Sequence, residues 1–124
     1  MLELGTDAPD FDLPEADGGT VALADFAEAP ALLVMFICAH CPFVQHLRDH
    51  FARTLNAYQT EGLAVVAINS NDIDRYPQDG PEAMSREKKE VGYTFPYLFD
   101  EDQKVAQAYR AACTPDFFLF DGDR

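Results

Sequence analysis

Two uninterrupted apolar runs most restrict how this chain can fold. Residues 31–37 read ALLVMFI and residues 63–69 read LAVVAIN, without the polar alternation of a strand that has one face in water. Runs of this kind are typical of strands buried on both faces, as in the middle of a parallel sheet. Parallel neighbours need a crossover connection, and residues 38–62 leave room for a helix between them.

The other segments continue this alternation of strands and helices. Residues 42–58 carry apolar side chains at every fourth position, which makes one helical stripe. Residues 81–93 begin with proline and an acid and carry lysines late, as the helix dipole favours. A third helix is expected over residues 101–112, and short strands over residues 95–100 and 116–121. The order predicts an α/β fold with a central, mainly parallel sheet and helices on both faces.

The first part of the chain predicts an N-terminal hairpin extension. Gly18-Gly19 is a hairpin turn signal, and a short strand is expected around residues 20–23. The length of 124 residues fits a single domain over residues 1–124.

The last residues of the sequence predict an apolar strand at the edge of the sheet. Asp121-Gly122 signals a turn after the apolar strand at 116–121, yet Arg124 is the last residue. An apolar strand left at a sheet edge invites pairing with another chain. The expectation is a C-terminally truncated form of a longer protein, or pairing with a second copy in a homodimer.

Composition limits the partners. With 22 acidic and 9 basic residues the net charge is −13, which repels nucleic acid and anionic membranes. No stretch reaches the roughly 18 apolar residues of a membrane span, and the first residues lack the pattern of a secretory signal. The sequence therefore predicts a cytoplasmic protein. Its three cysteines, Cys38, Cys41 and Cys113, are a small and odd number, which does not fit a disulfide scaffold.

Cys38-Ala39-His40-Cys41 falls where the first buried run ends and the helix begins. The unpaired N–H groups and the dipole of a helix N-terminus stabilise a thiolate there, which is the nucleophile of disulfide exchange. Cys38 stands at the entrance of the helix, and Cys41, about one turn later, can attack a mixed disulfide formed on Cys38. His40 would further favour the thiolate when protonated, and Pro42 costs no helical hydrogen bond in the first turn.

Metal binding is the alternative use of these thiols. Cys38, Cys41 and His46 have the spacing of a zinc knuckle, and His50 offers a fourth ligand. However, zinc knuckles are short autonomous loops, whereas here a core strand precedes the pair and a helix follows it. The sequence therefore favours solvated histidines on the helix and no bound metal.

The whole chain resembles the thioredoxin superfamily, in its redoxin branch of thiol-disulfide oxidoreductases and AhpC-TSA-type peroxiredoxins. The resemblance lies in FICAHCPFV, in the later CTPDFFLFD and in the opening LGTDAPDFDLPEADGGTVALADF. The extra segment from about Asn71 to Tyr93 is also similar to that branch. The resemblance implies a thioredoxin-like fold that here lacks the last strand and helix.

The resemblance also implies site residues beyond the CxxC pair. It matches Pro115 to the cis-proline that faces the two cysteines, and gives Thr114 a role in contacting an extended substrate. Cys113 is either a small buried residue or a third redox-active thiol. Thioredoxin has a buried acid where this chain has Leu32, so the proton of Cys41 must pass to water or to another group, for which Glu90 and Asp116 are candidates.

The leading functional prediction is a dithiol-disulfide oxidoreductase without a cofactor. Its substrate would be a disulfide in a protein or a small molecule, and an NADPH-linked reductase or a small thiol would recycle it. A peroxidase with Cys41 or Cys38 as its peroxidatic cysteine is the alternative, because Cys41-Pro42 is similar to the peroxidatic cysteine and proline of peroxiredoxins. Arg110 is then the nearest candidate for their activating arginine. A third hypothesis is a module that handles metal ions or interacts with other proteins through Cys38 and Cys41.

Overall fold

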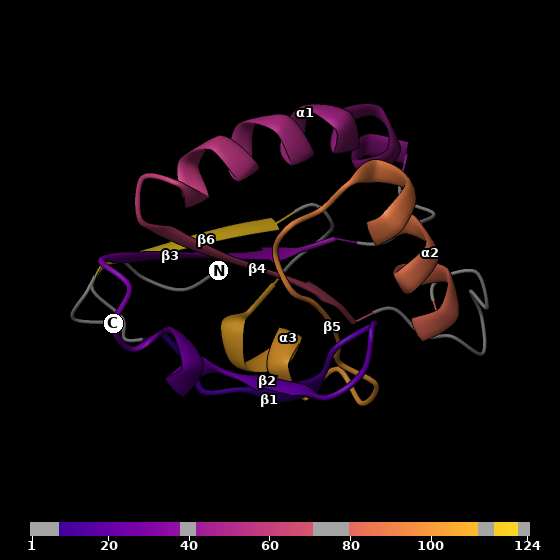
Figure 1. The fold of residues 1–124 in the computed structure, drawn as a ribbon. Helices are drawn as coiled ribbons and strands as arrows, with labels where there is room; N and C mark the ends of the chain where they lie inside the picture. Colours follow the sequence, from indigo (N-terminus) through magenta and orange to yellow (C-terminus); the bar gives the residue numbers. More distant parts are fainter. Residues whose placement is uncertain (1–7, 38–41, 71–79, 112–115, 122–124) are drawn as a thin grey trace.

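The computed structural model describes residues 8–37, 42–70, 80–111 and 116–121, with the backbone alone for 42–48, 51 and 121 (Figure 1). Two short strands and a 3-10 turn precede a larger unit in which strands and helices alternate. In chain order the elements are β1 (Asp12–Pro14), β2 (Thr20–Ala22), η1 (Leu23–Phe26), β3 (Ala31–Phe36), α1 (Pro42–Gln59), β4 (Leu63–Asn69), α2 (Pro81–Val91), β5 (Tyr97–Phe99), α3 (Lys104–Tyr109) and β6 (Asp116–Asp121).

The main sheet has the strand order β5-β4-β3-β6. The two apolar runs pair in parallel as predicted, with Phe36 opposite Ile68, and β5 adds to β4 in parallel. The last strand, β6, runs antiparallel to β3, with Phe36 opposite Asp116. The prediction of a mainly parallel α/β sheet is therefore confirmed.

Both faces of this sheet are covered. Figure 1 shows α1 and α2 on one side, and α3 with the β1–β2 hairpin on the other. Strand β3 divides its side chains between the two layers, because successive residues point to opposite faces. Met35 lies in the cluster under α1 and α2, whereas Val34 lies in the cluster with Tyr109 of α3. All three side chains are fully buried.

The N-terminal hairpin covers the β5 edge of the sheet. Strands β1 and β2 pair antiparallel, and Gly18 and Gly19 take left-handed φ values of 112° and 75° between them. The N–H of Ala16 donates to the carbonyl of Tyr97 at 2.9 Å, and Glu15 forms an isolated antiparallel bridge with Leu98. The predicted hairpin extension is therefore confirmed, and it occupies hydrogen-bonding groups of β5.

Helix α3 is shorter than the sequence predicted. Gln103 and Arg110 bound it, and both take left-handed backbone conformations with φ values of 62° and 55°. Such conformations cannot continue a right-handed helix. The segment 101–103 is a turn instead, and the N–H of Gln103 donates to the carbonyl of Asp100 at 3.2 Å.

Strand β6 presents one apolar face to solvent. Phe118 is buried at 6% exposure, whereas Phe117 and Leu119 are 40% and 71% exposed. These two side chains lie beside Met35 and Leu33 of β3, on the side of the sheet that α1 covers further along. That this strand pairs with a further strand or with a second copy stays a prediction.

Candidate active site

The strand-to-helix junction predicted for the cysteine pair is present. The side chain of Ile37 is fully buried, and its N–H donates to the carbonyl of Ile68 at 3.0 Å, so the parallel ladder continues to the last residue before the pair. Helix α1 begins at Pro42, which confirms that the proline stands in its first turn. Residues 38–41 themselves, including Cys38, His40 and Cys41, lie outside the described residues.

The segment with the predicted substrate contacts leads into the neighbouring strand. Cys113, Thr114 and Pro115 also lie outside the described residues, but β6 begins directly after them at Asp116. Asp116 pairs with Phe36 at the end of β3. Strand β3 therefore ends just before the CxxC segment, and the neighbouring strand β6 begins just after the Thr-Pro segment. Both segments adjoin the same end of these two strands.

A buried polar cluster lies at the same end of the sheet, where β4 and β5 finish. Asn69 and Asp100 are both fully buried. The carboxylate of Asp100 accepts hydrogen bonds from the Ser70 hydroxyl at 2.7 Å and from the backbone N–H groups of Ala106 at 2.9 Å and Val105 at 3.3 Å. It therefore joins the end of β4 to the first turn of α3.

Sequence reasoning did not single out Asp100. A local signal was available, since an aspartate follows an apolar strand shortly before a helix, and such residues satisfy free N–H groups at helix starts. The bond to Ser70 has no such signal, because it joins residues that are thirty positions apart.

The two residues suggested as proton acceptors differ in their placement. Leu32, in the position of thioredoxin's acid, is fully buried and offers no group that could accept a proton. Glu90 is exposed on α2, which argues against a proton acceptor inside the molecule. Asp116 is half-buried at the start of β6, and its carboxylate accepts from the N–H of Phe117 at 3.0 Å.

Arg110, suggested as the activating arginine of a peroxidase, is exposed at the end of α3.

No metal centre is found among the residues that the structure describes. Within them, no three histidine, cysteine or acidic side chains are grouped so that they could hold an ion. His50 is exposed, and its Nε2 lies 3.4 Å from the hydroxyl of Thr54. The side chains of Cys38, Cys41 and His46, the other candidate zinc ligands, lie outside the described part of the structure.

The helices within the described ranges are too short or too polar to span a membrane.

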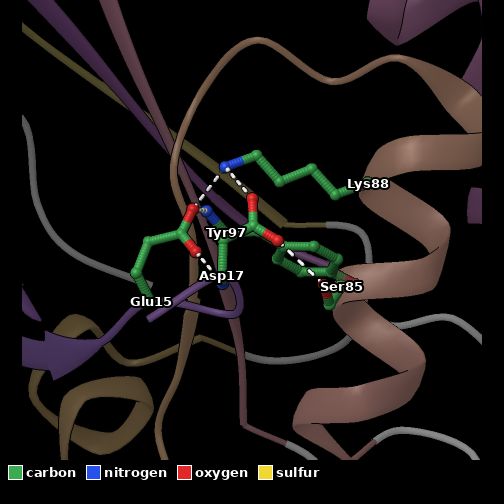
Figure 2. A network of polar contacts seen from close by, with 5 residues as sticks. All are labelled: Glu15, Asp17, Ser85, Lys88 and Tyr97. Atoms are coloured by element: carbon green, nitrogen blue, oxygen red, sulfur yellow. Dashed lines mark hydrogen bonds and ion pairs between the residues drawn. The ribbon is translucent and has the colours of Figure 1, made fainter. Parts of the chain in front are cut away.

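A network of charges ties the hairpin to α2 (Figure 2). The ammonium group of Lys88 contacts Glu15 and lies 3.1 Å from Asp17, and the hydroxyl of Ser85 donates to Asp17 at 2.8 Å. The carboxylate of Glu15 also accepts from the N–H of Tyr97 at 3.3 Å. We call Glu15, Asp17, Ser85 and Lys88 the hairpin clasp.

The clasp shifts the ionisation of two of its members. The hydrogen bond from Ser85, followed by that from Lys88, lowers the pKa of Asp17 below its ordinary value. Burial alone would lower the pKa of Lys88, but hydrogen bonds to Glu15 and Asp17 outweigh it and raise this pKa. Both shifts favour the charged forms, so the clasp is an ionic contact over most of the pH range.

The sequence model of the AhpC/TSA family matches residues 4–124. The chain belongs to the AhpC/TSA family. Its sheet and helices also match the thioredoxin domain of a thiol-disulfide oxidoreductase from Bacteroides vulgatus, with a TM-score of 0.80 at 20% identity over 98% of this chain and 84% of that chain. The fold is thus thioredoxin-like, as the resemblance implied.

The curated proteins similar to this chain carry two kinds of name. A protein of Mycobacterium tuberculosis H37Rv that is assigned as a peroxiredoxin is 34% identical over 110 residues, which cover 89% of this chain and 65% of that protein. The thiol-disulfide oxidoreductase ResA of Bacillus subtilis is 25% identical over 115 residues, 93% of this chain and 60% of its own length. The chain thus spans less than two thirds of these curated relatives.

A crystal structure of higher identity comes from a protein without a named activity. SMc02350, a hypothetical protein of Sinorhizobium meliloti 1021, is 52% identical, with a TM-score of 0.97 over 100% of this chain and 68% of that chain. Membership of the AhpC/TSA family and the thiol-disulfide oxidoreductases among its relatives support an oxidoreductase enzyme.

Proposed function

We propose that this protein exchanges disulfides through Cys38 and Cys41. The observation that carries the proposal is the junction of β3 and α1: the buried strand runs to Ile37, and a helix of eighteen residues begins at Pro42. These bounds support a place for both thiols near the N-terminal end of a long helix, where free N–H groups favour an anion. The adjacent start of β6 supports a substrate-contacting role for Thr114 and Pro115 beside them.

The proposed reaction transfers two electrons in two steps. The thiolate of Cys38 attacks a disulfide of the substrate, so that a mixed disulfide forms and one substrate thiolate leaves. Cys41, as a thiolate, then attacks the sulfur of Cys38, releases the second substrate thiolate and leaves the 38–41 disulfide. A small thiol or an NADPH-linked reductase reduces that disulfide in turn, in a reducing compartment such as the cytoplasm. His40 would stabilise the Cys38 thiolate when protonated.

The test is reduction of insulin disulfides together with the reduction potential of the 38–41 pair. Cys38→Ser is expected to abolish turnover. Cys41→Ser is expected to abolish turnover as well, but to accumulate a mixed disulfide on Cys38 that mass spectrometry detects. Cys113→Ser, the matched control, keeps activity unless Cys113 is a third redox thiol. A wild-type protein that neither reduces nor oxidises disulfides would refute the proposal.

A peroxidase is the second candidate, and the relative assigned as a peroxiredoxin supports it. In that reaction a cysteine thiolate attacks a peroxide oxygen, becomes a sulfenic acid and releases water or an alcohol after protonation. The placement of Cys41 directly before Pro42 favours Cys41 as that residue. Consumption of hydrogen peroxide by Cys38→Ser but not by Cys41→Ser would establish this function in place of the first.

A further inference from the structure

The N-terminal hairpin is attached to the rest of the molecule in two different ways along its length. Its base packs through apolar side chains: Phe11 is buried at 3% exposure, and Leu13 and Val21 pack against the cluster on the α3 side of the sheet. The N–H of Leu23 also donates to the carbonyl of Phe11 at 3.0 Å. The base is therefore held mainly by burial of apolar surface, the dominant stabilising term in folding.

The tip of the hairpin, residues 15–19, lacks an anchor of this kind. It reads Glu-Ala-Asp-Gly-Gly, so Ala16 carries its only apolar side chain. Asp17, Gly18 and Gly19 are exposed. Ala16 packs against the cluster under α1 and α2, but a single methyl group buries little apolar area. Polar contacts therefore hold the tip in place.

Those polar contacts join the tip to β5 and to α2. Tyr97 of β5 makes two of them, because its carbonyl accepts from the N–H of Ala16 at 2.9 Å and its own N–H donates to the carboxylate of Glu15 at 3.3 Å. The same carboxylate contacts the ammonium group of Lys88, which also lies 3.1 Å from Asp17 (Figure 2). Lys88 therefore restrains both acids of the tip, and one of these acids binds the edge of β5.

We infer that residues 15–19 form a strap over the edge of β5 that opens without unfolding of the sheet, and that Lys88 keeps this strap closed. A segment with few buried apolar contacts opens at a lower free energy than the core of the same protein. Opening breaks both hydrogen bonds between Tyr97 and the tip, and it exposes the edge of β5 at that point to another extended chain. The inference does not depend on the proposed disulfide exchange.

The partial burial of the contact sets the size of the effect. The side chains of Lys88 and Glu15 are 17% and 9% exposed, so water and salt screen their charges less than those of a surface pair. The loss of such a pair lies between that of a surface pair and that of a buried one. Without the ammonium group, the ratio of closed to open straps should therefore fall by about tenfold to about a hundredfold.

Hydrogen exchange of individual amides, followed by NMR under reducing conditions, tests the inference on the whole chain. In the wild type, the amides of Ala16 and Tyr97 should be less protected than those of Leu23, in the base of the hairpin, and Ile37, which donates to the carbonyl of Ile68. Low concentrations of urea should leave exchange of the two strap amides unchanged, because opening exposes little surface. The same urea should accelerate exchange of Ile37, which requires unfolding of the sheet.

Three variants then test the role of the clasp. Lys88→Met should reduce the protection of the Ala16 and Tyr97 amides by about tenfold to about a hundredfold. Lys89→Met removes an equal charge from the next, exposed residue and should leave both amides unchanged. Ser85→Ala removes the hydroxyl that donates to Asp17 at 2.8 Å, and should reduce the protection of both amides severalfold.

Two results would overturn the inference. The first is a wild-type protein in which urea accelerates the strap amides as much as Ile37, because the strap would then open only with the sheet. The second is a folded Lys88→Met variant whose strap amides are as protected as those of Lys89→Met. If Lys88→Met does not fold, Ser85→Ala decides instead, and unchanged protection in that variant counts against the clasp.

Discussion

The hairpin clasp allows one contact to be tested quantitatively. Lys88, on α2, is replaced by methionine (Lys88→Met), which removes the ammonium group and keeps most of the aliphatic stem. The side chains of Lys88 and Glu15 are 17% and 9% exposed, so this pair lies between a surface ion pair and a buried one. Breaking a surface pair costs about 0 to 1 kcal/mol, whereas breaking a buried one costs about 3 to 5 kcal/mol. The expected loss in free energy of unfolding is therefore about 2 kcal/mol.

Urea unfolding under reducing conditions measures this loss. Lys89→Met is the matched control, because it removes an equal charge from the next, exposed residue; its cost is expected to stay below about 0.5 kcal/mol. Adding Glu15→Gln to Lys88→Met should recover more than about 1 kcal/mol in a double-mutant cycle, since the stranded carboxylate is removed. Equal losses for the two lysine variants, or a coupling energy near zero, would refute the reasoning.

The pH dependence of the clasp has a defined sign. The pKa of Asp17 is lowered from its ordinary 3.8, so its contribution is complete above that value and is lost as the pH falls through the lowered pKa. The pKa of Lys88 is raised from 10.5, so its contribution is complete below 10.5 and is lost as the pH rises through the raised pKa. The difference in stability between wild type and Lys88→Met should therefore be largest between about pH 5 and about pH 9.

Two further substitutions test the packing. Tyr109→Phe removes a hydroxyl that donates to the carbonyl of Pro9 at 2.7 Å, and should cost about 1 to 2 kcal/mol in urea unfolding. Because burial, followed by the charge of Asp10, raises the pKa of Tyr109, wild-type stability should also fall above about pH 10, and a variant with an unchanged alkaline slope would contradict this. Gly62→Ala should cost about 1 to 3 kcal/mol, since Gly62 has a φ of 104° and a Cβ there would lie 3.2 Å from Cγ of Pro30. Gly19→Ala, with open space around it, should cost less by thermal unfolding, and equal costs would exclude crowding as the cause.

Local patterns were enough to predict most elements of the fold. The apolar runs of β3 and β4 and the four-residue spacing of α1 depend on neighbours along the chain, and the structure confirms all three. The length of α3 was wrong, because left-handed conformations at Gln103 and Arg110 depend on surroundings that the local sequence does not encode.

The site was predictable only in part, for a related physical reason. The junction around Cys38 and Cys41 is local, and the sequence placed it correctly between β3 and α1. The contact between Glu15 and Lys88 joins residues 73 positions apart, and chain periodicity carries no information about such a distance. The cis state predicted for Pro115 and the positions of the thiols remain predictions.

The cover that the hairpin places over β5 limits how copies of this molecule can assemble. Edge-to-edge polymerisation needs two free strand edges on each subunit, because one must accept the preceding copy while the other offers itself to the next. Glu15 and Ala16 already occupy groups of β5, so within the described residues only β6 presents an open edge of the main sheet. If copies pair through that single edge, growth ends after one partner, so we expect a finite pair rather than a fibre.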